Sequence, residues 1–423
     1  MIGGGRRQYW GRGVLVAVSL FATAGLAGCG HSRAPLGNRV RGHELTVYAS
    51  VPLHGASAVS GVAILDGARL ALADAGGRVG RYRIVLKGLD DSTVQRGQWD
   101  PGQTTLNARR AILDSTTIGY VGELDSGASA VSIPLLNRAE IAQVSPASTG
   151  AGLTVSDAGA FPGEPAKYYP TGVRTFARVV PNDGVQAAAQ VKLQKRLGCT
   201  GTYVLDDGDV DGQDLASSFA AAARLGGLRI VAAQEFQPRA TNYTSVVASI
   251  AQTRANCVLL SAIADSGPAR LFEQLAAALP RAHIFGSSGM AESTFSDPAL
   301  GGIPKRLDGR ILITVAALGA NSYPPAGRSF LVRYAARYGR PEPDALYGYE
   351  AMSLMLAAIA RATHGGRQVP RRSEVAAQLL LTRDRHSVLG TYSIDGNGDT
   401  TIRRYGVWKI VAGRLRFLEP ISA

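Results

Sequence analysis

The chain has 423 residues, 46% of them hydrophobic, and a formal net charge of +13. This length is sufficient for two domains of ordinary size. A positive charge is compatible with nucleic-acid binding, but no basic run exceeds two residues, as at Arg109–Arg110, so we expect no nucleic-acid partner. The six histidines and three cysteines show no metal-ligand spacing, so neither a metal nor a cofactor is expected.

The first 28 residues resemble a lipoprotein signal peptide. Several arginines precede the apolar run VLVAVSLFATAGLA (14–27), which is too short to span a membrane comfortably. The run leads into LAGC (26–29), which resembles a bacterial lipobox with Cys29 as the acylated residue. Cys29 would then anchor an exported chain to the outer face of the cell membrane, in the periplasm or its equivalent. A chance cysteine after an ordinary signal peptide is the alternative. Residues 29–43 are polar and rich in glycine and arginine, which predicts a tether.

From residue 44 onward, short β-branched runs alternate with longer helical patterns. Strands are predicted at 45–51, 82–89, 117–122 and 141–145, and helices at 58–75, 102–114 and 126–138. The pattern then restarts with a strand at 175–180 and a helix at 184–197. Further strands begin near 202, 228, 257, 283 and 310, and helices cover 212–225, 242–254 and 266–279. This repetition predicts an α/β fold of two Rossmann-like lobes, each with a parallel sheet.

The last hundred residues complete the two lobes. Helices are predicted at 326–338, 344–363 and 372–382, followed by a strand at 392–394 and a hairpin at 405–419. Ligands in such sheets bind at the carboxyl ends of the strands. The segments at these ends are 122–129, 145–149, 206–212, 262–266 and 286–289.

One such segment, GELDSGASA (122–130), has the composition of an anion site. The hydroxyl of Ser126 and the amide of Gly127 would lie at the N-terminus of the predicted helix, where the helix dipole favours an anion. Ser148 and Thr149 of SPAST (145–149) follow the next strand and, together with Ser126, could bind one ligand carboxylate. The alternative is that Ser126 merely caps its helix. The G-x-S-x-G elbow of a serine nucleophile is absent, so we do not predict an enzyme.

Acidic residues follow strands of the second lobe. Asp183, Asp211 and Asp265 are candidates for holding an ammonium group. Helix capping is the alternative for each of them, and it is the expected role of the aspartates at 206, 207 and 209.

Six motifs in order carry a family resemblance. They are PLHG (52–55), the pair Asp90-Asp91, G-x-x-x-S (122–126) followed by Pro134, SPAST (145–149), LYGYEA (346–351) and VLGTYSIDGNGD (388–399). With these motifs, residues 44–419 resemble the leucine/isoleucine/valine-binding family of type I periplasmic binding proteins.

The resemblance implies two lobes that close on a ligand about three crossings, near residues 181, 315 and 391. The first lobe would comprise 44–181 and 316–390, and the second 182–315 and 391–423. It further implies a monomeric lipoprotein that delivers a small polar solute, amino-acid-like and including branched-chain amino acids, to an ABC permease and its ATPase. A ligand-sensing receptor of the same fold, coupled to a signalling partner, is the alternative.

The resemblance also implies residue roles. Positions matching Ser126, Ala147 and Thr149 hold an amino-acid carboxylate in the family, and the position of Asp183 faces the ammonium group. The chain departs from the family at Ser60, where an aromatic residue is common. It departs again at Ser288, where amino-acid binders carry a glutamate. Either Asp211 or Asp265 replaces the missing acid, or the ligand is not an α-amino acid.

The family's topology bears on the cysteines. Cys199 and Cys257 begin the first and third strands of the second lobe, which are neighbours in a flavodoxin-like order. We therefore predict a disulfide between them, with two buried free thiols as the alternative.

Overall fold

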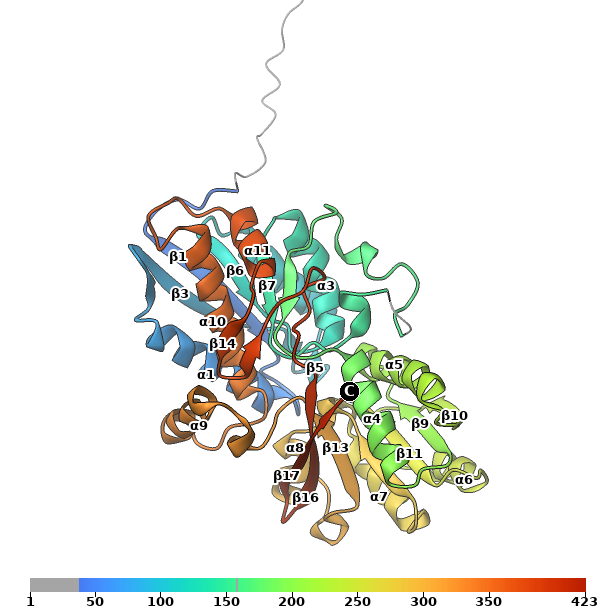
Figure 1. Cartoon of the computed structure of the whole chain (residues 1–423). Helices are drawn as coiled ribbons and strands as arrows, with labels where there is room; N and C mark the ends of the chain where they lie inside the picture. Colours follow the sequence, from blue (N-terminus) through green and yellow to red (C-terminus); the bar gives the residue numbers. More distant parts are fainter. Residues whose placement is uncertain (1–37, 157–158) are drawn as a thin grey trace, which may run out of the picture. The chain divides into compact units, whose positions relative to one another are not determined.

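Two β-sheets flanked by helices organise residues 38–156 and 159–423, the part of the chain that this computed structural model describes (Figure 1). The first sheet has the strand order β2-β3-β1-β6-β7-β8, and the second has the order β10-β9-β11-β12-β13-β16-β17. Parallel pairs dominate both sheets, with antiparallel pairs at β2–β3, β13–β16 and β16–β17. The predicted α/β fold of two lobes is therefore confirmed. The predicted lipidation residue Cys29 and the signal peptide lie outside the described residues.

The first lobe combines a sheet from the start of the chain with helices from both ends of it. Its strands are β1 (Glu44–Val51), β2 (Arg78–Val79), β3 (Tyr82–Asp90), β6 (Thr117–Val121), β7 (Ala142–Ser145) and β8 (Phe176–Arg178). Its helices are α1 (Ala58–Asp74), α2 (Pro101–Leu113), α3 (Ser126–Arg138), α9 (Pro325–Tyr338), α10 (Ala345–Ala362) and α11 (Arg372–Leu380). Two small hairpins, β4 (Ser92–Thr93) with β5 (Gln98–Trp99) and β14 (Arg385–Ser387) with β15 (Gly390–Tyr392), complete the lobe.

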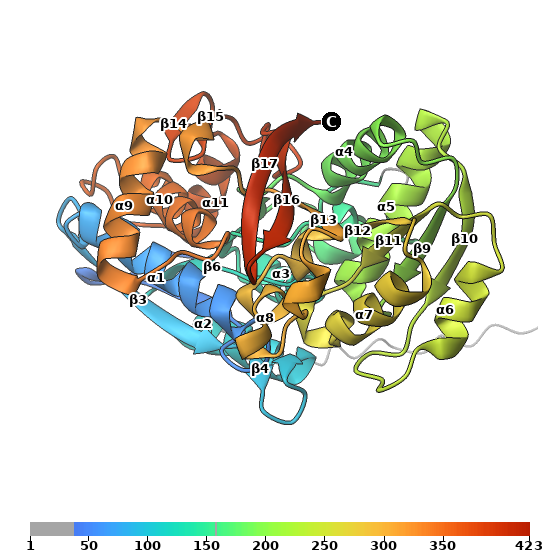
Figure 2. The same cartoon turned by 90° about the horizontal axis from the view of Figure 1, so that it is seen from below.

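The second lobe is built on the middle of the chain and its end (Figure 2). Its strands are β9 (Thr202–Asp206), β10 (Ile230–Glu235), β11 (Cys257–Ser261), β12 (His283–Gly286), β13 (Ile311–Val315), β16 (Arg404–Val411) and β17 (Arg414–Ser422). Its helices are α4 (Asp183–Arg196), α5 (Val210–Gly226), α6 (Thr244–Ala251), α7 (Pro268–Ala278) and α8 (Ser293–Ser296).

Helix α10 joins the first lobe through close contact with α1. A Cβ added to Gly67 would lie 2.2 Å from the carbonyl oxygen of Ala345, and one added to Gly348 would lie 2.4 Å from that of Ile64. All of these neighbours are backbone atoms, so only glycine allows the two helices to approach this closely. The contact holds the start of α10 beside the middle of α1.

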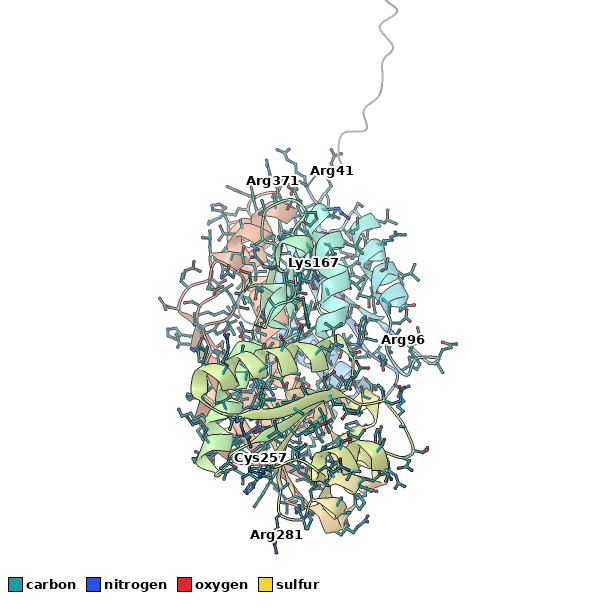
Figure 3. The ribbon with its side chains drawn as sticks, turned by 90° about the vertical axis from the view of Figure 1, so that its right-hand side faces the viewer. Arg41, Arg96, Lys167, Cys257, Arg281 and Arg371 are labelled. Carbon is teal, nitrogen blue, oxygen red and sulfur yellow. A yellow bond between two sulfur atoms is a disulfide. The ribbon has the colours of Figure 1, made fainter. Side chains whose placement is uncertain are left out.

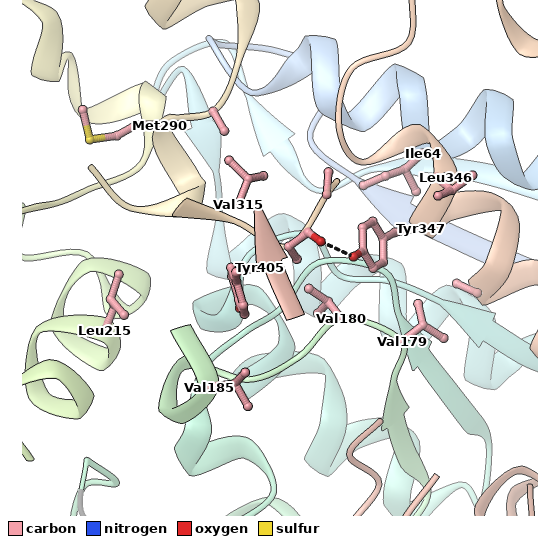
Figure 4. Packing of buried hydrophobic residues seen from close by; sticks show 14 of the residues in the cluster. Ile64, Val179, Val180, Val185, Leu215, Met290, Val315, Leu346, Tyr347 and Tyr405 are labelled. Carbon is pink, nitrogen blue, oxygen red and sulfur yellow. Dashed lines mark hydrogen bonds between the residues drawn. The ribbon is translucent and has the colours of Figure 1, made fainter. Parts of the chain in front are cut away.

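Two tyrosine hydroxyls form hydrogen bonds to the segments that connect the lobes. Tyr347 of α10 donates its hydroxyl proton to the carbonyl of Ala316, which directly follows β13, at 2.8 Å (Figure 4). Tyr405 of β16 donates to the carbonyl of Pro181, just before α4, also at 2.8 Å. Both rings are buried in the same apolar cluster as Val180 and Val315. The core of each lobe is therefore continuous with the linking segments.

The predicted disulfide is confirmed. Cys199 and Cys257 are bonded, with their Cα atoms 5.8 Å apart. Cys257 begins β11, and Cys199 lies just before β9, so the bond joins β11 to the segment that leads into its neighbouring strand.

Part of the predicted tether is held by the first lobe. The amide of Val40 donates to the carbonyl of Pro370 at 2.9 Å, while the Asn38 side chain donates to the Ser373 hydroxyl and accepts from the Ser373 backbone amide. Basic side chains are spread from Arg41 and Arg371 near this end to Arg281 on the far side of the second lobe (Figure 3). Among the helices of the described ranges, none combines the length and apolarity needed to cross a membrane.

Candidate functional site

A cavity of about 60 Å³ lies between the lobes at the carboxyl ends of their strands. The first lobe contributes Ser57 from the loop after β1, Leu124 and Asp125 from the turn after β6, and Ala147 and Thr149 from the loop after β7. Asp344, directly before α10, completes this wall. The position agrees with the rule that ligands bind at strand ends in open α/β sheets.

The second lobe faces the cavity with helix starts and strand-end loops. Asp183 is the first residue of α4, and Asp211 lies in the first turn of α5. Ile263 follows β11, while Ser288 and Glu292 follow β12. The wall is therefore assembled from segments that are far apart in sequence.

The cavity is strongly acidic. Among the described residues, its lining includes five carboxylic acids and no basic side chain; the acids are Asp125, Asp183, Asp211, Glu292 and Asp344. One oxygen of Asp183 and one of Asp125 are buried without a hydrogen-bond partner in the described structure. Carboxylates that lack protein donors in this way are suited to receiving N–H donors from a ligand.

Burial and mutual repulsion disfavour the ionised state of these acids. Burial raises the pKa of Asp183 to about 6, against the lowering effects of the Thr149 hydroxyl and the Arg178 charge. Burial likewise raises the pKa of Asp211 to about 6 and the pKa of Asp344 to about 6. The pKa of Glu292 is raised well above its ordinary value by burial and then by the charge of Asp265. A cation in the cavity would reverse these shifts, because it would stabilise the charged carboxylates.

The nearest buried arginine does not supply that cation, because its donors are already used. Arg178 donates from Nε to Asp399 at 2.6 Å and from Nη1 to the carbonyl oxygens of Ser148 (3.1 Å) and Gly150 (2.7 Å). It therefore fixes the loop that carries Thr149, and these hydrogen bonds go to groups other than the acids that line the cavity.

The two lobes meet directly at the start of α3. The backbone amide of Ser126 donates to Oδ1 of Asp211 at 2.9 Å and to Oδ2 at 3.1 Å. The Ser126 hydroxyl accepts a hydrogen bond from the amide of Gly150 at 2.9 Å. Asp125 occupies the N-cap position of α3, so the alternative in which Ser126 is the N-cap residue is wrong.

Other contacts between the lobes surround a second cavity, of about 460 Å³, at the rim. Asp265 lines it and accepts hydrogen bonds from the amides of Ala56 and Ser57 of the first lobe. Arg239 donates to the carbonyl oxygens of Arg96 (2.7 Å) and Gly97 (3.1 Å). The described arrangement is therefore one in which the lobes are closed on each other.

The structure gathers half of the residues proposed from the sequence around the central cavity: Ala147, Thr149, Asp183, Asp211 and Ser288. Ser60 is completely buried in α1 and does not line the cavity, and its hydroxyl has no hydrogen-bond partner in the described structure. Gly127 of α3 does not line the cavity; it packs against Trp99, whose ring would lie 2.3 Å from an added Cβ. Ser148 points into its own lobe, and its hydroxyl lies 2.7 Å from that of Ser129.

Sequence reasoning missed three of the five acids. Asp125 and Asp344 both stand directly before a helix, which is the usual place of a capping residue. Neither side chain forms a capping hydrogen bond in the structure. Glu292 follows the position of the family's glutamate, Ser288, by four residues, so an acid near that position could have been sought further along the loop.

The described residues contain no cluster of three or more His, Cys, Asp or Glu side chains arranged to hold a metal ion. The closely spaced aspartates at 206–211 are used in local turns, since Asp207 accepts from the amide of Asp209 and Asp209 from that of Asp211.

The fold is similar to that of several solved solute-binding proteins. The leucine-binding protein LivK of Thermotoga maritima has 21% sequence identity and a TM-score of 0.76, with 89% of this chain and 99% of that chain covered. LivJ of Streptococcus pneumoniae, solved with isoleucine, has 17% identity and a TM-score of 0.74, with coverage of 90% and 100%. A solute-binding protein of R. palustris, solved with benzoate, has 19% identity and a TM-score of 0.72, with coverage of 90% and 98%.

A search among curated proteins gave no match. The family model described as periplasmic binding protein matches residues 45–414, which is most of the chain. The resemblance drawn from the six motifs is confirmed by this match and by the fold. The chain belongs to the periplasmic binding protein family, whose members bind solutes and are not enzymes.

Proposed function

We propose that the protein is the extracytoplasmic solute-binding component of an ABC importer and that it captures a small solute bearing an ammonium group. The observation that carries this proposal is the acidic cavity between the lobes, in which Asp183 and Asp125 each present a buried oxygen without a partner. Ligand contacts to both walls would favour the closed arrangement, with movement about crossings near residues 181, 315 and 391.

Similar proteins support the transport role and leave the ligand open. The structures of LivJ and of the R. palustris protein hold isoleucine and benzoate, respectively. A benzoate-like anion would lack a basic partner among the described lining residues, whereas an ammonium group would meet several carboxylates. Amines and α-amino acids are therefore the first solutes to test.

A thermal-shift screen of amino acids, amines, amides and aromatic acids tests this function. At least one solute with an ammonium group should raise the melting temperature, because a ligand that binds only the folded protein stabilises it. Asp183→Asn should weaken the binding of the best such solute at least tenfold by calorimetry, since it removes one negative charge from the ammonium site. The matched control is Asp384→Asn, an exposed aspartate outside the cavity, which should bind like the wild type. A screen in which no solute stabilises the protein contradicts the proposed function.

We also propose that Cys29 anchors the exported protein to the membrane through a lipid. This rests on LAGC (26–29) at the end of the apolar N-terminal run. In cells fed labelled palmitate, the wild-type chain should incorporate the label and fractionate with membranes. Cys29→Ala should lose the label; continued labelling of this variant would rule out lipidation at Cys29.

A further inference from the structure

We propose that the ligand is a small organic amine without a carboxylate, because Asp211 itself fills the anion position at the start of α3. This inference rests on the proposed function and specifies the class of ligand. It follows from three observations: the partner of the Ser126 amide, the unpartnered acids of the cavity, and the apolar part of its wall.

The first observation is that an anion of the protein already binds at the N-terminus of α3. Both carboxylate oxygens of Asp211 lie within 3.1 Å of the Ser126 amide nitrogen. The positive end of a 13-residue helix favours a negative charge at this place. Asp211 comes from the second lobe, so closure of the lobes itself delivers the carboxylate to α3.

Asp211 is held in this position by its own loop. Its amide donates to Oδ1 of Asp209 at 3.3 Å, and Oδ2 of Asp209 accepts from the indole nitrogen of Trp99, in the first lobe, at 3.3 Å. The N-terminus of α5 is thus attached to the first lobe at two points, through Asp209 and through Asp211. A ligand carboxylate directed at the Ser126 amide would have to displace Asp211 or lie beside it, where the two like charges repel each other.

The second observation concerns the charge that the cavity lacks. Asp183 and Asp125 are almost completely buried, and each has an oxygen without a hydrogen-bond partner in the described structure. Glu292 and Asp344 line the same cavity, and no described basic side chain does. The complementary ligand therefore brings positive charge and several N–H donors, as an ammonium or amidinium group does.

The third observation is that the remaining wall is aliphatic. Leu124 of the first lobe and Leu215 and Ile263 of the second line the cavity, whose volume is only about 60 Å³. A short hydrocarbon chain would pack against these aliphatic side chains. Together the walls fit a small aliphatic amine, and the subsite that would select for an acid is occupied.

Matched pairs of solutes that differ only in the carboxyl group test this inference. Calorimetry at pH 8 would compare putrescine with ornithine and 3-methylbutylamine with leucine. At least one amine should bind tenfold or more tightly than its parent amino acid. In Asp211→Asn this preference should shrink at least tenfold, because the carboxylate that repels the amino acid has lost its charge. Asp206→Asn, at the end of β9 and outside the cavity lining, should keep the wild-type preference.

The outcomes separate this inference from the proposed function. If an amino acid binds but no amine binds tenfold more tightly than its parent amino acid, the inference is overturned while the proposed function stands. If none of the amines binds but the wider screen finds another solute, the inference is likewise overturned. If no solute binds at all, both fail. The wild-type comparison alone is decisive should Asp211→Asn not fold.

Discussion

Arg178→Met is expected to lower the free energy of unfolding by about 3–5 kcal/mol, the cost of removing one partner from a buried ion pair. Arg178 is completely buried at the end of β8 and pairs with Asp399, 221 residues further along the chain. The variant leaves Asp399 without its arginine, and it leaves the carbonyl oxygens of Ser148 and Gly150 without their donor. Unfolding in urea, followed by circular dichroism, would measure the loss.

The matched control is another arginine in an ion pair, Arg196, which contacts Glu419. The side chains of Arg196 and Glu419 are both about half exposed, so Arg196→Met should change the unfolding free energy by no more than about 1 kcal/mol. If Arg178→Met lowered the unfolding free energy by no more than this control, the buried ion pair would not be needed to fix the loop that carries Thr149. A large loss in Arg178→Met alone would show that the loop behind the ligand site depends on a contact between distant segments.

The sequence pattern was sufficient for the two sheets but not for every contact between distant segments. Each long strand is a β-branched run followed by a helical pattern, and this local signal survives in the structure at β1, β6, β9 and β11. The pairing of α10 with α1 depends on glycines that allow backbone contact, which no periodicity encodes. The strand predicted at 392–394 overlaps only the last residue of β15, which pairs with β14 in a hairpin whose strands of three residues are too short for a pattern.

Site residues were predictable from the sequence where they directly follow a predicted strand. Thr149, Asp183 and Ser288 follow predicted strands, and the strand-end rule brings them to one cavity. Asp344 was not predictable, because an aspartate before a helix looks like a cap whether or not its side chain bonds there. Arg178 resembled an ordinary strand residue, since its partner Asp399 becomes its neighbour only in the folded chain.

The acidic cavity also predicts that the buried carboxylates of the site lower the stability of the folded protein. Asp183→Asn should raise the unfolding free energy of the ligand-free protein at pH 8 by about 3 kcal/mol, although it weakens ligand binding. The pKa of Asp183 is raised from 3.8 to about 6 in the folded state, and each unit of pKa shift corresponds to about 1.4 kcal/mol. A raised pKa means that the folded protein holds the proton more tightly than the unfolded chain. Stability from this group is therefore complete below about pH 4 and is lost as the pH rises through 6.

Asparagine is neutral throughout this range, so the difference between Asp183→Asn and wild type should be small at pH 4 and largest at pH 8. Urea unfolding at the two pH values measures it, with Asp384→Asn, an exposed aspartate, expected to stay within about 0.5 kcal/mol of wild type at both. The charge of Asp183 also raises the pKa of Asp211 and of Asp214, so its removal eases the ionisation of its neighbours. An Asp183→Asn variant that is less stable than wild type at pH 8 would contradict this account. A gain in stability together with a loss of binding would mean that the Asp183 carboxylate serves ligand binding, because its charge destabilises the folded protein.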